Sequence, residues 1–206
     1  MVNATRGEAG VDVSERAGTT PLAEVRQAEL AASLGRVGVT EHHWLPYRDG
    51  RLAEVAPQEG VEAVGRFLAA VRPDTVVTFG PDGMTGHPDH RTISDWTTRA
   101  WLAAGRPGRL WYATLTPEFH ETWGALNTEV GLWFAGSTPP AVPVAQLAHT
   151  VRLTGGHARR KFAALEAHTS QTAGLIRVAG ARRYQQWWSE EYFVDAARHL
   201  DPVAAR

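Results

Sequence analysis

The chain has 206 residues and a mass of 22.5 kDa, with 43% hydrophobic and 21% charged residues, which is typical of a folded globular protein and excludes a disordered one. It has no cysteine, so disulfides, thiolate metal sites and cysteine nucleophiles are excluded, and any metal must be bound by His, Asp or Glu. The formal net charge is −1, with basic residues scattered along the sequence, which disfavours nucleic acid or an anionic membrane as a partner.

The first half of the chain alternates helical and strand patterns. Apolar residues at helical spacing predict helices, and short β-branched or aromatic runs predict strands. The predicted order is a helix over 21–35, a strand over 39–45, a helix over 57–71, a strand over 75–79, a helix from Pro88 past Trp101 and a strand over 109–115. This alternation implies one α/β domain over residues 1–206, doubly wound and Rossmann-like, with a mostly parallel sheet and ligands beyond the carboxyl ends of its strands.

The remaining segments give weaker signals. Residues 117–127 are expected to be a short helix, residues 136–143 a proline-rich loop, and residues 157–169 and 181–194 two more helices. Residues 1–20 are polar and rich in glycine, although a doubly wound domain normally starts with a buried apolar strand. We therefore expect the fold to lack its first strand and first helix.

No segment of the sequence has the features of a membrane span or of an export signal. No apolar run approaches the roughly 20 residues that cross a bilayer. The first residues also lack the apolar core of a signal peptide. A cytoplasmic location is the resulting expectation.

A pair of histidines follows the clearest predicted strand. His87 and His90 are three residues apart at the start of a predicted helix, so both imidazoles point to one side and could reach one substrate or ion. Asp89 lies in the first turn, where the helix dipole favours a carboxylate and where it could orient an imidazole. The pair alone is weak evidence for zinc, because a catalytic zinc usually has three protein ligands.

The longer string Gly-His-Pro-Asp-His-Arg over residues 86–91 resembles a signature of the zinc-dependent PIG-L or LmbE-like N-deacetylases. Residues 4–10, 22–30, 47–50 and 161–171 are similar to the same family, so the resemblance covers nearly the whole chain. It implies a bacterial hydrolase that removes an acetyl group from an N-acetylglucosamine-type conjugate, with zinc polarising the amide carbonyl and activating water. By this resemblance His90 is a zinc ligand, His87 stabilises the oxyanion with Asp89 as its support, and Arg26 and Asp49 bind the substrate.

The sequence departs from the family at another signature. In relatives a His-Pro-Asp-Asp string supplies two zinc ligands and the general base, and no such string occurs here. Because that string precedes the segment that begins here at Thr5, we expect the working protein to be longer. Substitute ligands would have to come from His42, His43, Asp49 or Asp82, and the strict geometry of zinc disfavours such a site, so zinc is expected to be weak or absent.

Several alternatives stay open at this point. Arg26 could instead pair with Glu29, and Asp49 could belong to an ordinary Asp-Gly turn. The chain could also be a non-catalytic relative that binds an amino-sugar conjugate or another protein. A nucleotide-binding domain is the weakest alternative, because no Gly-x-Gly-x-x-Gly follows a strand. Roles for Glu8, His168 and Gln171 do not follow from the sequence, Trp123 or Trp133 could stack on a sugar, and Trp96 and Trp101 are predicted core residues.

Overall fold

A computed structural model describes residues 1–14 and 19–200. The chain divides into two compact units, the first made of residues 1–50 and 152–190, the second of residues 51–151 and those from 191 on. The expected single domain stays a prediction. In chain order the elements are β1 (Val2–Asn3), α1 (Leu22–Val37), β2 (His43–Trp44), η1 (Leu52–Glu54), α2 (Pro57–Val71), β3 (Thr75–Phe79), α3 (Pro88–Ala103), β4 (Arg109–Thr114), α4 (Pro117–Glu129), η2 (Val144–Gln146), β5 (His149–Arg152), α5 (Gly155–Glu166), α6 (Thr169–Ala179), α7 (Ala181–Trp187), β6 (Glu190–Asp195) and α8 (Ala196–Leu200).

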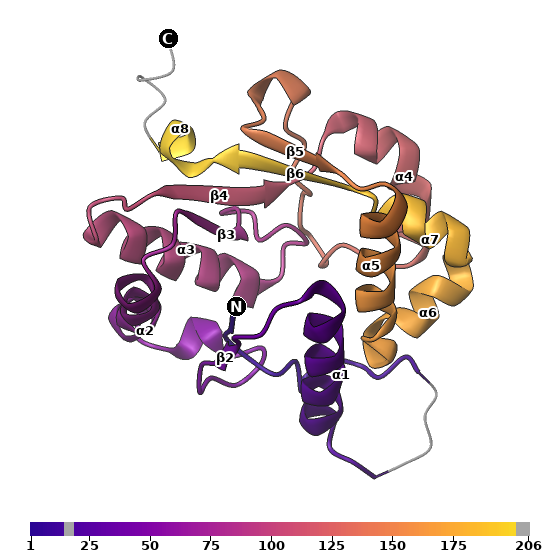
Figure 1. Ribbon diagram of the computed structural model, residues 1–206, viewed down its shortest axis with the longest axis horizontal. Helices are drawn as coiled ribbons and strands as arrows, with labels where there is room; N and C mark the ends of the chain where they lie inside the picture. Colours follow the sequence, from indigo (N-terminus) through magenta and orange to yellow (C-terminus); the bar gives the residue numbers. More distant parts are fainter. Residues whose placement is uncertain (15–18, 201–206) are drawn as a thin grey trace. The chain divides into compact units, whose positions relative to one another are not determined.

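The second unit is built around a four-stranded sheet (Figure 1). Its strands lie in the order β3-β4-β6-β5, with β3 and β4 parallel and β6 antiparallel to β4. The helix α3 packs along β3, and α2 packs against α3 (Figure 1). The predicted α/β fold is confirmed, and the antiparallel β6 makes the sheet mixed.

Close packing between α2 and α3 forms much of this unit's core. The indole of Trp96 is 1% exposed and lies over Gly60, where an added Cβ would be 2.1 Å from the ring. Trp101 is also buried, and its Nε1 donates to the carbonyl oxygen of Pro107 at 3.0 Å. Both tryptophans are therefore core residues, as predicted.

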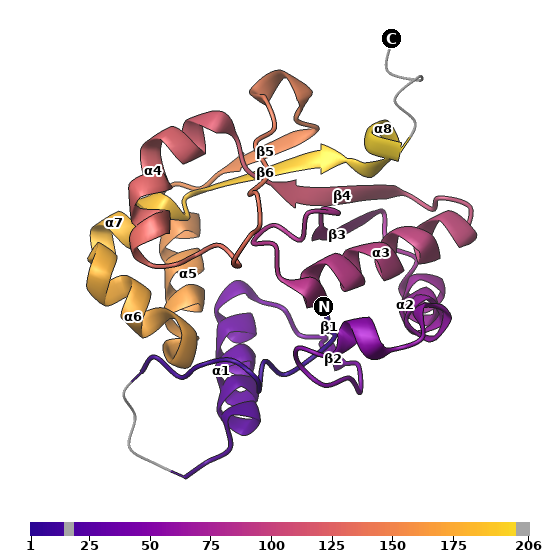
Figure 2. The ribbon, with the colours of Figure 1, turned by 180° about the vertical axis from the view of Figure 1, so that it is seen from behind.

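The first unit is mainly helical (Figure 2). Its two short strands pair in parallel, with Val2 opposite His43. The helix α1 packs against α5 and α6, and α6 packs against α7. Leu30 and Leu34 of α1 and Tyr184 and Trp187 of α7 are buried, so the apolar faces of these helices form the core of this unit.

Most predicted elements are confirmed, and the main correction concerns residues 181–194. The helix predicted over 57–71 and the strand predicted over 75–79 match α2 and β3 at both ends. Residues 181–194 are a helix only as far as Trp187. The following residues form β6, in which Val194 pairs with Tyr112 of β4. Pairing with a distant strand overrides the local helical pattern there.

Other differences are smaller. The strand expected over 39–45 is only the two residues of β2, and the helix expected over 157–169 ends at Glu166, where the chain turns into α6. Sequence patterns did not predict α6, β1 or β5. In residues 1–14 and 19–200 no helix is both long and apolar enough to span a membrane.

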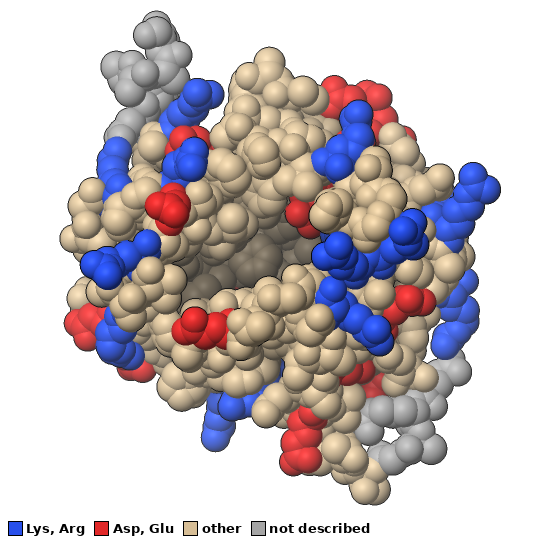
Figure 3. Space-filling model, viewed as in Figure 1, with Lys and Arg blue, Asp and Glu red and all other residues tan. Residues whose placement is uncertain are grey.

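Charged side chains are spread less evenly along the chain than its net charge suggests. In the view of Figure 3, Lys and Arg gather over α5 and α7. Residues 152–183 contain one acidic residue, Glu166, and the basic residues Arg152, Arg159, Arg160, Lys161, Arg177, Arg182 and Arg183. The net charge of −1 therefore hides a basic segment in the first unit.

Candidate functional site

The predicted histidines lie on the loop between β3 and α3, in the second unit. The loop leaves the carboxyl end of β3 at Phe79, passes Gly86 with a φ of +83°, and enters α3 with His87 as N-cap and Pro88 as the first helical residue. The imidazole of His90 stacks on Phe79, with ring centroids 4.0 Å apart, and the His87 and His90 centroids are 5.1 Å apart. The structure therefore brings both histidines to the carboxyl end of a parallel strand, as predicted.

Hydrogen bonding defines which nitrogen of His87 carries the proton. The backbone N–H of Asp89 donates to Nδ1 of His87 at 3.1 Å. Because an amide N–H can only donate, Nδ1 is unprotonated, and the neutral imidazole carries its proton on Nε2. His87 can thus donate a hydrogen bond through Nε2 without being positively charged.

His90 has the opposite arrangement. Its Nδ1 lies 3.0 Å from the carbonyl oxygen of Gly83 and 3.3 Å from the hydroxyl of Thr85. A carbonyl oxygen only accepts, so Nδ1 carries the proton and Nε2 has the lone pair. A backbone carbonyl on one imidazole nitrogen is a common way to orient the other toward a metal or a proton donor.

Asp89 supports the loop differently from the sequence-based expectation. Its side chain is 5% exposed, and Oδ1 accepts from the backbone N–H of Leu52 at 3.1 Å. It is the backbone N–H of Asp89, rather than its carboxylate, that binds Nδ1 of His87. The carboxylate thus joins the start of α3 to η1.

A second loop, residues 131–137, binds the histidine loop through hydrogen bonds to Thr85. The backbone N–H of Phe134 donates to the carbonyl oxygen of Thr85 at 2.8 Å, and the hydroxyl of Ser137 donates to the same oxygen at 3.1 Å. The ring of Phe134 meets that of His87 edge to face, with centroids 5.3 Å apart. Nothing in this irregular stretch of sequence predicted the contact.

Replacing Gly86 with alanine is expected to destabilise this loop. A Cβ at Gly86 would lie 2.1 Å from Cβ of Ser137, on a backbone whose φ is +83°. Left-handed strain and overpacking together should lower the free energy of unfolding by about 2–4 kcal/mol, measured by urea denaturation. Gly124→Ala is the control, because a Cβ there meets nothing within 4 Å. Equal stability of the two variants would contradict the close contact between Gly86 and Ser137.

The other two predicted site residues lie together in the first unit. The guanidinium of Arg26 donates to the carbonyl oxygens of Gly7 and Val11. The carboxylate of Asp49 accepts from the hydroxyl of Thr5 and from the backbone N–H of Ala9, both at 3.0 Å. Partial burial lowers the pKa of Arg26, and the nearby Asp49 opposes that shift. Both side chains therefore hold the loop of residues 5–11.

Two residues whose roles the sequence left open belong to the same unit. Oε1 of Glu8 accepts from the backbone N–H of Asp49 at 3.0 Å, so Glu8 is part of this loop arrangement. Nδ1 of His168 lies 3.3 Å from Nε2 of Gln171. Burial lowers the pKa of His168, Arg26 lowers it further, and Glu29 opposes them.

Glu29 fastens α6 to α1. Its carboxylate accepts from the backbone N–H of Ser170 at 2.6 Å and from the hydroxyl of Ser170 at 2.7 Å. The carbonyl oxygen of Ser170 in turn accepts from the backbone N–H of Val13 at 2.8 Å. Ser170, which lies in the family-like segment 161–171, therefore anchors α6 to α1 through the carboxylate of Glu29.

Ser170→Ala is expected to lower the free energy of unfolding by about 1.5–3 kcal/mol, the usual contribution of a hydrogen bond to a charged group. The side chain of Ser170 is buried and its hydroxyl binds Glu29. The adjacent Thr169→Ala serves as the control, because that hydroxyl is exposed and donates only to the carbonyl oxygen of Glu166. Denaturation that shifts no more for Ser170→Ala than for the control would refute the anchoring role.

The lowered pKa of His168 predicts a pH dependence. The unfolded chain binds this proton more readily than the folded chain, so stability is full well above about pH 6.5 and falls as the pH drops below it. His168→Gln should remove part of the stability loss between about pH 8 and about pH 5 in urea denaturation. The pKa of His42 is also lowered by burial, so a residual slope is expected. If the free energy of unfolding of His168→Gln depends on pH as steeply as that of the unmodified chain, His168 does not cause the stability loss.

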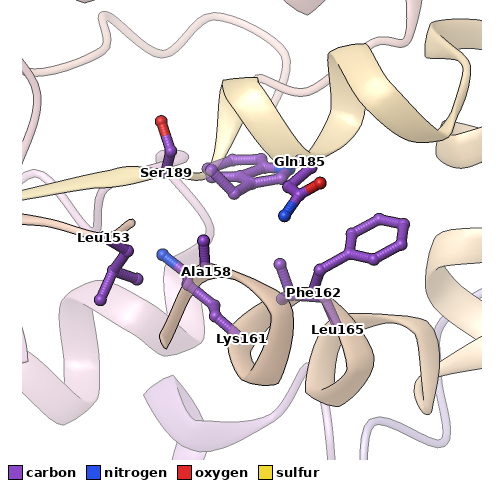
Figure 4. Close-up of a pocket in the computed structure, with 8 residues that line it drawn as sticks. Leu153, Ala158, Lys161, Phe162, Leu165, Gln185 and Ser189 are labelled. Carbon is purple, nitrogen blue, oxygen red and sulfur yellow. The ribbon is translucent and has the colours of Figure 1, made fainter. Parts of the chain in front are cut away.

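A small cavity lies beside Lys161, the single lysine of the sequence, in the first unit (Figure 4). Its walls include Leu153, Phe162 and Gln185, and its volume is about 10 Å³. That volume holds about one water molecule. The cavity therefore reflects packing between α5 and the end of α7 and does not accommodate a substrate.

Comparison with known proteins shows the family of this chain. The family profile "PIG-L: GlcNAc-PI de-N-acetylase" matches residues 1–101. A 1D-myo-inositol 2-acetamido-2-deoxy-alpha-D-glucopyranoside deacetylase of Kineococcus radiotolerans is 33% identical to this chain over 245 aligned positions, which cover 94% of this chain and 68% of the relative. The chain belongs to the PIG-L deacetylase family.

Further comparisons agree with this membership. A protein of the same description from Salinispora arenicola is 29% identical, and the alignment covers 83% of this chain and 66% of the relative. This PIG-L family chain thus spans about two thirds of the length of these relatives. A deacetylase triple mutant of the teicoplanin biosynthetic pathway has the same fold, with a TM-score of 0.63, 15% identity, and coverage of 94% of this chain and 83% of that structure.

The family resemblance implies zinc, and a zinc site in this PIG-L family chain would need a group of His, Asp or Glu side chains as ligands. Within residues 1–14 and 19–200 no three His, Asp or Glu side chains are grouped so that they could hold a metal ion. Among the substitutes considered, Nε2 of His42 binds Oδ1 of Asn3 at 3.0 Å, and Oδ1 of Asp82 accepts from the backbone N–H of Met84 at 2.6 Å. The described residues do not fit a complete zinc site, and weak zinc binding stays a prediction.

Proposed function

We propose that this chain belongs to an N-deacetylase that removes the acetyl group from an N-acetylglucosamine-type conjugate. Support comes from the 33% identity to a deacetylase of such a conjugate. The observation that carries the proposal is the pair His87 and His90, with opposite protonation patterns at the start of α3. The substrate would be a small amino-sugar conjugate, with neither nucleic acid nor membrane as partner, in the cytoplasm.

The chemistry assigned to His87 is stabilisation of an oxyanion. Amide hydrolysis passes through a tetrahedral intermediate whose oxygen carries negative charge, and a preorganised donor for that oxygen typically contributes about 10²–10³-fold in rate. Nε2–H of His87 is such a donor, and the backbone of Asp89 together with the ring of Phe134 hold the imidazole in place. The positive end of the α3 dipole adds to the stabilisation.

Zinc dependence belongs to the same proposal through the family resemblance alone. His90 is the residue assigned to the metal, since its Nε2 has the lone pair. A bound zinc would act as a Lewis acid on the amide carbonyl. The described residues do not complete a metal site.

Arg26 and Asp49 are proposed to act on the substrate through the loop of residues 5–11. Their side chains bind the backbone of that loop at Gly7, Val11 and Ala9. The loop positioned in this way would present its groups to the sugar. Direct contact of either side chain with a sugar hydroxyl stays a prediction.

The decisive experiment is acetate release from N-acetylglucosaminyl-inositol, with and without added zinc, using the Kineococcus radiotolerans relative as the positive control. Acetate release that His87→Ala and His90→Ala abolish would support the proposal. If both variants release acetate as fast as the unmodified chain does, the active site lies elsewhere.

A second candidate is a non-catalytic protein that binds amino-sugar conjugates. It is favoured by one observation, that the described residues have no group of three potential metal ligands. It predicts saturable binding of the same conjugate without acetate release at any zinc concentration. The acetate assay and a binding assay on the same preparation therefore separate the two functions.

A further inference from the structure

Basic side chains gather over two neighbouring helices of the first unit, α5 and α7 (Figure 3). The two helices lie side by side, because the rings of Phe162 and Tyr184 meet with centroids 6.0 Å apart. Four arginines of these helices are exposed, and together they are called the basic surface: Arg159, Arg160, Arg182 and Arg183. None of the four has a role in the proposed deacetylase site.

Acidic side chains do not neutralise the basic surface. Residues 152–183 contain seven basic residues and a single acidic one, Glu166, so the rest of the chain has 14 basic and 21 acidic residues. Arg152 is paired with Glu190, with Nε and Oε1 2.7 Å apart. Within the part of the chain that the structure describes, none of the four arginines of the basic surface has such an ion pair. Their positive charge is therefore available to a partner.

The helix dipoles do not favour this arrangement of charges. The amino-terminal end of a helix is the positive end of its dipole, so it stabilises acidic side chains and destabilises basic ones. Arg182 and Arg183 nevertheless lie in the first turn of α7, which has no acidic residue. In α5 the acidic Glu166 lies at the carboxyl end, where the dipole favours a basic residue. Charges that lower the stability of two neighbouring helices indicate a role in binding.

The chemistry of the basic surface favours carboxylates on a protein. A planar guanidinium binds a carboxylate through two parallel hydrogen bonds. Single-stranded nucleic acid also needs aromatic rings for its bases, and a bilayer surface needs apolar side chains that insert into it. Every aromatic or large apolar side chain of α5 and α7 is buried or half-buried, so neither kind of contact is offered. The negative remainder of the chain would also repel a long polyanion.

We propose that the basic surface binds an acidic segment of a partner protein. A helix rises about 1.5 Å per residue, so the 12 residues of α5 span about 18 Å. An extended peptide rises about 3.3 Å per residue, so a segment of about six residues covers the same length. The expected ligand is a run of about six residues rich in Asp and Glu. This interaction goes beyond the proposed deacetylation and does not require it.

Binding is measured by the fluorescence anisotropy of labelled hexaglutamate, with hexaglutamine as the neutral control peptide. Saturable binding of hexaglutamate that weakens at high salt is expected. Arg160→Glu on α5 and Arg183→Glu on α7 should each weaken it about threefold to tenfold, because each replaces an attraction with a repulsion. Arg66→Glu on α2 changes the net charge equally but does not alter the basic surface, so its binding should be unchanged.

Arg183→Glu also separates binding from folding. An acidic residue in the first turn of α7 should leave the midpoint of urea denaturation unchanged or raise it, so lost binding would not reflect lost stability. The proposal is overturned if hexaglutamate does not saturate, if hexaglutamine binds equally well, or if both variants bind as the unmodified chain does. Tighter binding of a thymidylate hexamer or of phosphatidylserine vesicles than of hexaglutamate would also overturn it. Acetate release is measured separately, so failure of either proposal is recognised by itself.

Discussion

Trp96→Ala is expected to lower the free energy of unfolding by about 3–5 kcal/mol, the largest stability effect of any single substitution considered. The indole is 1% exposed and fills the space between α3 and Gly60 of α2. Removing it leaves a cavity beside Gly60, which has no side chain to fill the space. Urea denaturation followed by far-UV circular dichroism gives the change.

Two further variants make this stability test specific. Trp123→Ala in α4 is the matched control, since Trp123 is only half-buried and should cost much less. Gly60→Ala should also be destabilising, because a Cβ there would lie 2.1 Å from the indole. A Trp96→Ala variant no less stable than Trp123→Ala would show that the α2–α3 interface is not the core of this unit.

His87→Ala is expected to lower kcat for acetate release by about 10²–10³-fold with little change in KM, because a donor to the oxyanion acts in the transition state. His87→Gln should retain part of the rate, since an amide N–H can also donate.

The exposed His157→Ala is the control for that series, because His157 is not one of the residues assigned to the site. A His87→Ala variant with an increased KM and an unchanged kcat would assign His87 to ground-state binding.

Local signals in the sequence predicted the elements that have a clear apolar period, a run of β-branched residues or a proline at the first helical position. α2 begins at Pro57 and has its apolar residues at helical spacing, β3 is a run of β-branched residues, and Pro88 marks the start of α3. β6 was predicted as helix because its partner, β4, is about 80 residues away in sequence and no local pattern encodes that pairing. No element was predicted at β5, whose neighbour in the sheet is β6.

The sequence by itself determined the family, the position of the histidine pair and the residue types available to a metal. Only the tertiary structure decided the protonation pattern of His87 and His90, since this depends on the Asp89 N–H and the Gly83 carbonyl that the folded loop places beside the rings. It also showed that Arg26, Asp49 and Glu29 bind backbone and side-chain groups of their own unit. Motifs encode which groups are present, whereas hydrogen-bond partners and cavities arise from contacts between segments distant in sequence, and those exist only once the chain has folded.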